Sequence, residues 1–360
     1  MTKLPASALL IALTLPPAQE TATKQRRPEI QEVQERVTVE RVVVTGRVID
    51  RFANPIPGLG IGDFRLRVEG REAPIESIEW IPGEPRPPRS AVETTTSQAL
   101  EAGLPPKVST AGQQTPAAPS RTIVMLFQWE IAGQKDTGFV RMMRQAERFV
   151  NSANPTDRFA VLGFGSSLKL LQDLTTDHGA VRDAIEAVRS LTFSGSAVTP
   201  DGPALSASIT GCGSTGSIQK AIICIGNSLQ SFPGSKTMLF FGWSIGRGRG
   251  PERVEYPKMI EAIGKAQTSV WVLDVSGGKH TLAEGIARLA FETGGLYNGG
   301  CIYETVYCAD LIRLKVHRAV EGGTYEIVFR NPAAGRGWHE VDIELINRSG
   351  TPLFQRWYRN

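Results

Sequence analysis

The chain has 360 residues, of which 41% are hydrophobic and 21% are charged, and its formal net charge at pH 7 is +4. This length allows two or three domains, and this apolar content is ample for a packed core. Nucleic-acid binding is not expected, because the charge is small for this size. The one local basic cluster, at Arg247, Arg249 and Arg253, lies in a loop-like stretch without interleaved aromatic residues.

Residues 1–19 have the order of a secretory signal peptide. Lys3 precedes an apolar stretch, residues 4–15, which is shorter than the ~20 residues that a membrane-spanning helix needs. A typical A-x-A cleavage motif is absent, so a retained N-terminus with peripheral membrane association stays open beside cleavage. We therefore expect a periplasmic or extracellular protein in which residues 20–36 form a polar linker.

The next segment, residues 37–82, has the pattern of a small antiparallel β unit. Polar and apolar residues alternate in residues 37–49 and 64–68, with turn-forming pairs such as Asn54-Pro55 between them. Residues 83–120 are rich in Pro, Ser, Thr and Ala. Such a composition cannot bury enough apolar surface to order itself, so we expect a long loop there.

Residues 121–322 alternate short apolar runs with amphipathic helical stretches. The apolar runs, typical of strands buried on both faces, are residues 122–127, 158–164, 168–171, 236–241 and 269–274. Residues 138–150 and 178–191 have apolar side chains at helical spacing. Because parallel neighbours need long crossovers, this repetition predicts an α/β domain with a mostly parallel sheet and helices on both faces.

The C-terminal residues, 323–360, return to a β pattern. Strands are predicted at residues 324–330, 339–346 and 353–358. We expect them to pack with residues 37–82 as one small β-sandwich that brackets the α/β domain.

Four cysteines fit an oxidising compartment. Their even number favours disulfides, and we expect the pairs closest in sequence, Cys212 with Cys224 and Cys301 with Cys308. Other pairings stay open, as does a buried free thiol at Cys224, which has isoleucines on both sides. The spacings do not match a zinc site.

Several short motifs along the chain together resemble a known family. They are Val42-Val43-Val44, Pro57-Gly58-Leu59, Asp63-Phe64, Asn154-Pro155, Asp157-Arg158-Phe159-Ala160-Val161, Leu170-Leu171-Gln172-Asp173-Leu174-Thr175, Tyr325, His339 and Arg356-Trp357-Tyr358. In this order and spacing the chain resembles the von Willebrand factor type A-related secreted proteins of Acidobacteria and similar bacteria. The resemblance implies a Rossmann-like type A domain carried on a β unit.

The resemblance also implies a metal site at the strand tips, and here the sequence departs from it. Type A domains hold Mg²⁺ with a D-x-S-x-S motif after the first strand, a Thr from a second loop and an Asp from a third. The first motif reads Gln128, Trp129, Glu130, Ile131 and Ala132, whereas the second-loop Thr is kept as Thr199.

The third loop reads Gly242-Trp243-Ser244 and so lacks its Asp. We therefore expect a degenerate metal site and no cofactor. Weak Mg²⁺ or Ca²⁺ binding stays open through the oxygen groups of Glu130, Thr199 and Asp201.

Two tryptophans take the place of the lost ligands. Trp129 and Trp243 would lie on adjacent strand tips, and tryptophan is enriched at the centres of protein interfaces. The alternative is that both rings fold inward as core. We predict a metal-independent contact surface, named the crown, which consists of Gln128, Trp129, Glu130, Thr199, Asp201, Trp243 and Ser244. Its expected partner is a protein, such as an envelope component or a subunit of a larger assembly, and a glycan is the weaker option.

A serine hydrolase is the alternative function. Residues 242–246 read G-x-S-x-G after an apolar run, with Asp274 after the next run and His280, His317 and His339 downstream. A nucleophile elbow needs a helix to begin at Ser244, yet residues 246–251 are a glycine- and arginine-rich loop. We therefore do not expect an enzyme.

Overall fold

The computed structural model describes residues 41–83, 121–129, 136–190, 204–212, 215–246, 252–274, 282–298, 315–332 and 335–359. All of them belong to one compact unit, residues 39–360. The expected signal peptide and linker, residues 1–36, and nearly all of the expected loop at residues 83–120 lie outside the described residues.

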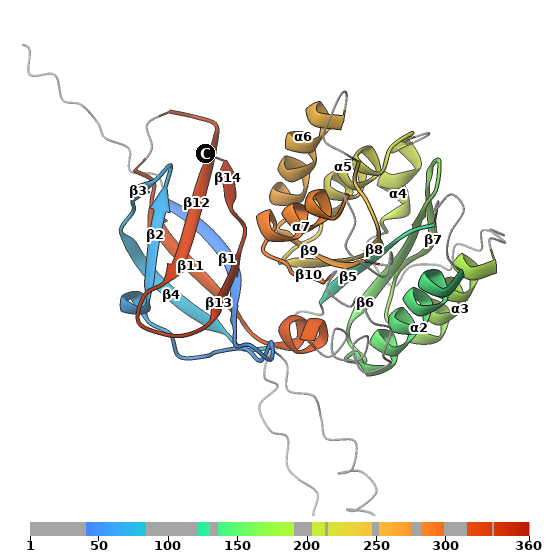
Figure 1. Ribbon diagram of the computed structural model, residues 1–360, viewed down its shortest axis with the longest axis horizontal. Coiled ribbons are helices and arrows are strands. Elements are labelled where there is room, and N and C mark those ends of the chain that lie inside the picture. Colours follow the sequence, from blue (N-terminus) through green and yellow to red (C-terminus); the bar gives the residue numbers. More distant parts are fainter. Residues whose placement is uncertain are drawn as a thin grey trace, which may run out of the picture. The chain divides into compact units, whose positions relative to one another are not determined.

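A six-stranded sheet with the order β10-β9-β8-β5-β6-β7 forms the centre of the α/β part (Figure 1). Its strands are β5 (Thr122–Gln128), β6 (Arg158–Phe164), β7 (Leu168–Thr175), β8 (Lys236–Gly242), β9 (Thr268–Asp274) and β10 (Tyr297–Asn298). Their order follows the doubly wound pattern, in which the first strand lies in the middle. The predicted α/β class with a mostly parallel sheet is confirmed.

One strand, β7, runs antiparallel to its neighbour β6, whereas the other pairings are parallel. Only residues 165–167 separate β6 from β7. A parallel return would need a crossover of a dozen or more residues, so this short connection allows only an antiparallel hairpin.

Helices cover both faces of this sheet (Figure 1). They are α2 (Asp136–Ser152), α3 (His178–Ser190), α4 (Ser206–Ile209), the 3-10 turn η2 (Thr210–Cys212), α5 (Ile218–Leu229), α6 (Glu252–Lys265) and α7 (Ala283–Glu292). Alternation along β5 divides the core, because successive strand side chains point to opposite faces. Val124 and Leu126 pack with apolar residues of α5, α6 and α7, whereas Met125 and Phe127 pack with those of α2 and α3.

The N- and C-terminal strands combine into two four-stranded sheets, which confirms the predicted small β-sandwich. One sheet has the order β13-β1-β11-β4 and the other the order β14-β12-β2-β3. The strands are β1 (Arg41–Ile49), β2 (Phe64–Val68), β3 (Arg71–Glu72), β4 (Ile75–Ile81), β11 (Thr324–Arg330), β12 (Trp338–Leu345), β13 (Thr351–Phe354) and β14 (Trp357–Arg359). The expected single strand at residues 353–358 is thus divided into two that join different sheets.

The division occurs where the chain touches the α/β part. Gln355 forms a β-bridge with Thr293, and the backbone N–H of Arg356 donates to the carbonyl of Glu292 at 3.0 Å. These bonds interrupt the strand at residues 355–356 and tie the sandwich to the end of α7, while the carbonyl of Arg356 still accepts from the backbone N–H of Val341 on β12 at 2.8 Å. No helix within the described ranges is both long and apolar enough to cross a bilayer.

Arg121 and Asp157 form an ion pair at the amino end of the sheet, in which the carboxylate is buried and the arginine is partly exposed. The Asp157 side chain is 1% exposed, its Oδ1 accepts from Arg121 Nε at 2.7 Å, and Arg121 also donates to the carbonyl of Val320 at 3.1 Å. A carboxylate left without its partner in such a place is strongly destabilising.

We expect Arg121→Met to lower the free energy of unfolding by ~3 kcal/mol, because it leaves the Asp157 carboxylate buried without a cation. Urea denaturation measures the change. Arg348→Met is the control, because the Arg348 side chain is 64% exposed beside Asp63, and its loss should cost less than about 1 kcal/mol. Equal effects of the two substitutions would contradict the assignment.

Candidate functional site

The tips of β5 and β8 lie side by side at the carboxyl edge of the sheet. Phe127 pairs with Phe241 across the two strands, and their rings stack with centroids 4.7 Å apart. Trp129 and Trp243 each follow this pair by two residues. The two tryptophans therefore start from the same level on adjacent tips, as the sequence predicts.

Gln128 joins the two tips. Its side-chain oxygen Oε1 accepts from the backbone N–H of Trp243 at 3.1 Å and from that of Ser244 at 3.3 Å, and the residue is 6% exposed. Gly242 makes room for this contact, because a Cβ there would lie 2.9 Å from Oε1. We name these two hydrogen bonds the Gln128 clasp.

The clasp changes the chemistry at the position where the resemblance implies a metal-binding Asp. A carboxylate would supply a charged oxygen to a hard cation, whereas the Gln128 oxygen is neutral and already accepts two amide hydrogens. Within the described ranges no group of three or more His, Cys, Asp or Glu side chains is placed to hold a metal ion. The other expected crown residues, Glu130, Thr199 and Asp201, lie outside the described residues.

Trp129 lies across the end of β6. A Cβ added at Gly165 would come 2.6 Å from its ring Nε1, and Gly163 is in equally direct contact with the ring. The Trp129 backbone N–H also donates to the carbonyl of Phe164 at 3.1 Å. One side of the ring is thus fixed by two glycines, and the residue is partly exposed.

Trp243 packs against the core cluster that contains Phe127 and Phe241, and it too is partly exposed. Neither crown tryptophan resembles Trp271, which is fully buried in the middle of β9. The structure therefore combines the two alternatives from the sequence, because each tryptophan is part of the core packing and part of the surface. Each ring packs on the protein through part of its surface and leaves another part accessible.

Ser244 is 3% exposed, and its Oγ accepts from the backbone N–H of Gly246 at 2.8 Å. Ser244 and Gln128 are therefore buried residues that shape the tips.

The groups named for a catalytic triad are engaged in other contacts. Asp274 accepts from the Tyr297 hydroxyl at 2.8 Å, and burial, together with this bond and the carboxylate charge, raises the pKa of Tyr297.

Two of the three histidines named for that triad lie elsewhere. His317 Nε2 donates to the carbonyl of Ser152 at 2.6 Å, and Ser152 ends the helix α2, which returns the chain to the amino edge of the sheet. His339 lies in the sandwich, with its ring centroid 5.4 Å from that of Tyr358. His280 lies outside the described residues.

Asp173 on β7 has a role that the sequence analysis missed. It is 1% exposed; its Oδ1 accepts from the N–H groups of Leu174 at 2.7 Å and Leu205 at 2.8 Å, and its Oδ2 accepts from that of Ser206 at 3.0 Å. Burial opposes ionisation, but the hydrogen bonds from Ser206 and the two other amides outweigh it and lower the pKa of Asp173. The carboxylate thereby fixes the start of α4, directly after the segment that carries Thr199.

A disulfide reinforces the same region. Cys212 and Cys224 are bonded, which confirms the first expected pair, and the bond joins η2 to α5. Cys301 and Cys308 lie outside the described residues, so their pairing stays a prediction.

No family model matches the chain. No curated protein sequence matches it either. Solved structures with a similar course of the chain include proximal thread matrix protein 1 from the mussel byssus, with 14% identity, a TM-score of 0.37 and coverage of 56% of this chain and 48% of that one. The match thus spans about half of the mussel protein.

Two bacterial structures are also similar. Protein BatB from Bacteroides thetaiotaomicron has 13% identity, a TM-score of 0.35 and coverage of 56% of this chain and 100% of that one. A von Willebrand factor type A protein from Catenulispora acidiphila has 8% identity, a TM-score of 0.40 and coverage of 67% and 65%, respectively. Because all three TM-scores are below 0.5, the fold assignment stands on the sheet order described above.

We expect Gln128→Met to lower the free energy of unfolding by about 1–3 kcal/mol, because it leaves the buried amides of Trp243 and Ser244 without an acceptor. Chemical denaturation followed by tryptophan fluorescence measures the change. Gln230→Met, at an exposed position on the end of α5, is the matched control and should stay within about 0.5 kcal/mol of the wild type. A wild-type unfolding curve for Gln128→Met would refute the clasp.

Proposed function

We propose that this chain is a secreted or envelope-associated binding and scaffolding module, related to the Acidobacteria-type proteins with a degenerate metal site. In this proposal the strand tips contact a protein partner without a bridging metal ion. The Gln128 clasp is the observation that carries the proposal. The Gln128 oxygen stands where the resembling family has a metal-binding Asp, and it accepts from two backbone amides of the protein. These bonds also hold Trp129 and Trp243 at the same edge of the sheet.

The contact surface of the crown would then centre on the two tryptophans. Rings that are already fixed on one side lose little freedom on binding, so more of their buried area contributes to affinity. Trp129 is fixed by Gly163 and Gly165, and Trp243 packs against the core cluster that contains Phe127 and Phe241. Glu130, Thr199 and Asp201 would supply the polar surroundings, while Gln128 and Ser244 position the tips from within.

The test is affinity purification of the tagged protein from its native envelope, with and without EDTA, for the wild type and the Trp129→Ala/Trp243→Ala variant. The wild type should retain a stoichiometric partner in EDTA. The double variant should lose at least tenfold in affinity, because each buried interface tryptophan contributes ~2 kcal/mol or more and about 1.4 kcal/mol is a factor of ten.

Trp338→Ala is the matched control, since Trp338 lies on the sandwich strand β12 and should leave the partner bound. Circular dichroism of each variant separates lost binding from lost folding. Release of the partner by EDTA, or its full retention by the folded double variant, would overturn the proposal.

A further inference from the structure

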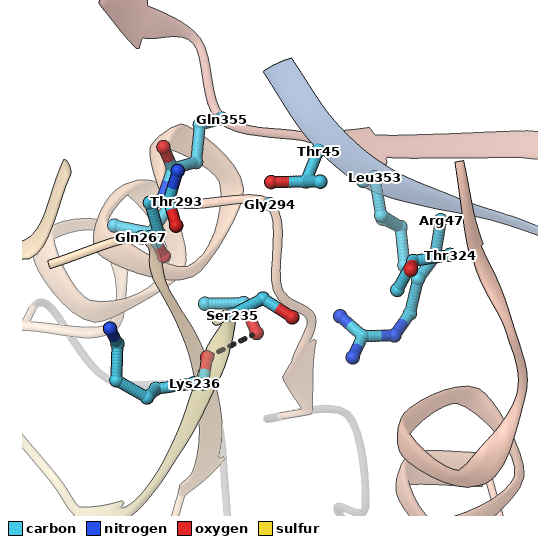
Figure 2. A pocket seen from close by; sticks show the side chains of 12 residues that line it. Thr45, Arg47, Ser235, Lys236, Gln267, Thr293, Gly294, Thr324, Leu353 and Gln355 are labelled. Carbon is cyan, nitrogen blue, oxygen red and sulfur yellow. Dashed lines mark hydrogen bonds between the residues drawn. The ribbon is translucent and has the colours of Figure 1, made fainter. Parts of the chain in front are cut away.

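A small cavity lies at the amino edge of the sheet, opposite the crown. It is bounded on one side by Ser235, Lys236 and Gln267, which lead into β8 and β9, and on the other by β1 and β11 of the sandwich (Figure 2). Its volume is about 20 Å³. By the same measure a single water molecule needs ~10–15 Å³, so the cavity has room for one group little larger than water.

Arg47 on β1 reaches into this cavity. The residue is 8% exposed, and Figure 2 shows its guanidinium directed toward the space beside Ser235. Its Nε is buried and has no hydrogen-bond partner among the described residues. A guanidinium carries five N–H donors and no acceptor, so only an oxygen or an anion can satisfy it.

The described lining of the cavity supplies Arg47 with no counter-charge. None of the described residues that line the cavity is acidic. The nearest compensation is the Trp271 ring, whose centroid is 5.9 Å from the guanidinium carbon, near the limit of a useful cation–π contact. Burial, with a smaller repulsion from Arg121, lowers the pKa of Arg47 to about 10.

Lys236 also lines the cavity, and Figure 2 shows its side chain directed away from Arg47. Lys236 is 4% exposed, and burial lowers its pKa. Its ammonium donates to the carbonyl of Phe232 at 2.6 Å, which is a neutral partner. Buried charges in proteins are normally paired, because an isolated one is expensive to remove from water.

We propose that this cavity binds one monatomic anion, with chloride as the natural ligand, held by the Arg47 guanidinium and the hydroxyl groups of Thr45, Ser235 and Thr324. The positive charge without an acidic neighbour selects an anion over a neutral molecule. The small volume favours a monatomic ion over phosphate, sulfate and carboxylates, which carry several heavy atoms.

The site lies between the sandwich and the α/β part, so a bound anion would contact both. Arg47 and Thr45 belong to the sandwich, whereas Ser235 and Lys236 belong to the α/β part. An anion between them would therefore join the two parts, next to the bridge between Gln355 and Thr293. A ligand that binds only the folded chain raises its stability with concentration.

The test compares thermal unfolding in sodium chloride and in sodium gluconate at equal ionic strength, which equalises the screening of surface charges. The wild type should show a higher Tm in chloride, with a rise that saturates, and bromide should reproduce it. Sulfate stabilises folded proteins by exclusion from their surface, so its effect should not saturate and should persist in Arg47→Met. Arg47→Met should lose the chloride-specific rise. Arg348→Met, which removes an exposed arginine, should keep it.

Bromide-soaked crystals of the wild type provide a measurement that does not depend on the folding of a variant. An anomalous peak within hydrogen-bonding distance of the Arg47 guanidinium is expected. Equal Tm values in chloride and gluconate would show that the cavity holds only water and would overturn the proposal. An anomalous map with no peak beside Arg47, or a chloride-specific rise that persists in folded Arg47→Met, would also overturn it.

Discussion

The parallel pairing of β5 with β6 on one side and β8 on the other is the constraint on which the rest of the structure depends. Every residue of β5 is buried, and its alternating side chains supply both core clusters. Because β5 and β8 run in the same direction and in register, their tips end at one level. The same pairing places the starts of the strands, and with them the charged groups Arg121, Asp157 and Lys236, at the opposite edge.

The two edges of the sheet differ in the polar groups that they bury. At the carboxyl edge, the amides that follow β8 need acceptors, and the neutral oxygen of Gln128 supplies one without introducing a charge that would call for a metal ion. At the amino edge, Asp157 is matched by Arg121, whereas the Nε of Arg47, which enters from the sandwich, has no hydrogen-bond partner among the described residues. The amides of Trp243 and Ser244 thus have an acceptor within the protein, whereas the Arg47 Nε has none within the part of the chain that the structure describes.

Much of the fold follows from sequence periodicity. The runs at residues 158–164 and 324–330 match their strands in full, since continuous and alternating apolar patterns specify strands buried on both faces and on one face. The Cys212–Cys224 pair followed from sequence proximity in the same way. The division of residues 353–358 was not predictable, because its cause is a bridge from Gln355 to Thr293, far away in the sequence.

The site was harder to predict than the fold. The sequence shows Gln128 where the resembling family has an Asp, but the acceptor role of its side chain depends on amides about 115 residues away. Asp173 lay within a motif of the resembling family, yet its contacts with Leu205 and Ser206 needed the three-dimensional structure. That the Arg47 Nε has no acceptor among the described residues is a property of its surroundings in space, which sequence alone does not show.

The most direct test of the central claim, that the clasp has replaced the metal site, is a titration with Mn²⁺ followed by the electron paramagnetic resonance signal of the free ion. The account predicts that the free signal rises in proportion to the added Mn²⁺ from the first addition, with no equivalent withdrawn by the protein. A saturable loss of one equivalent of free Mn²⁺, abolished by Glu130→Ala or Thr199→Ala, would contradict the account. It would show that the crown binds a cation.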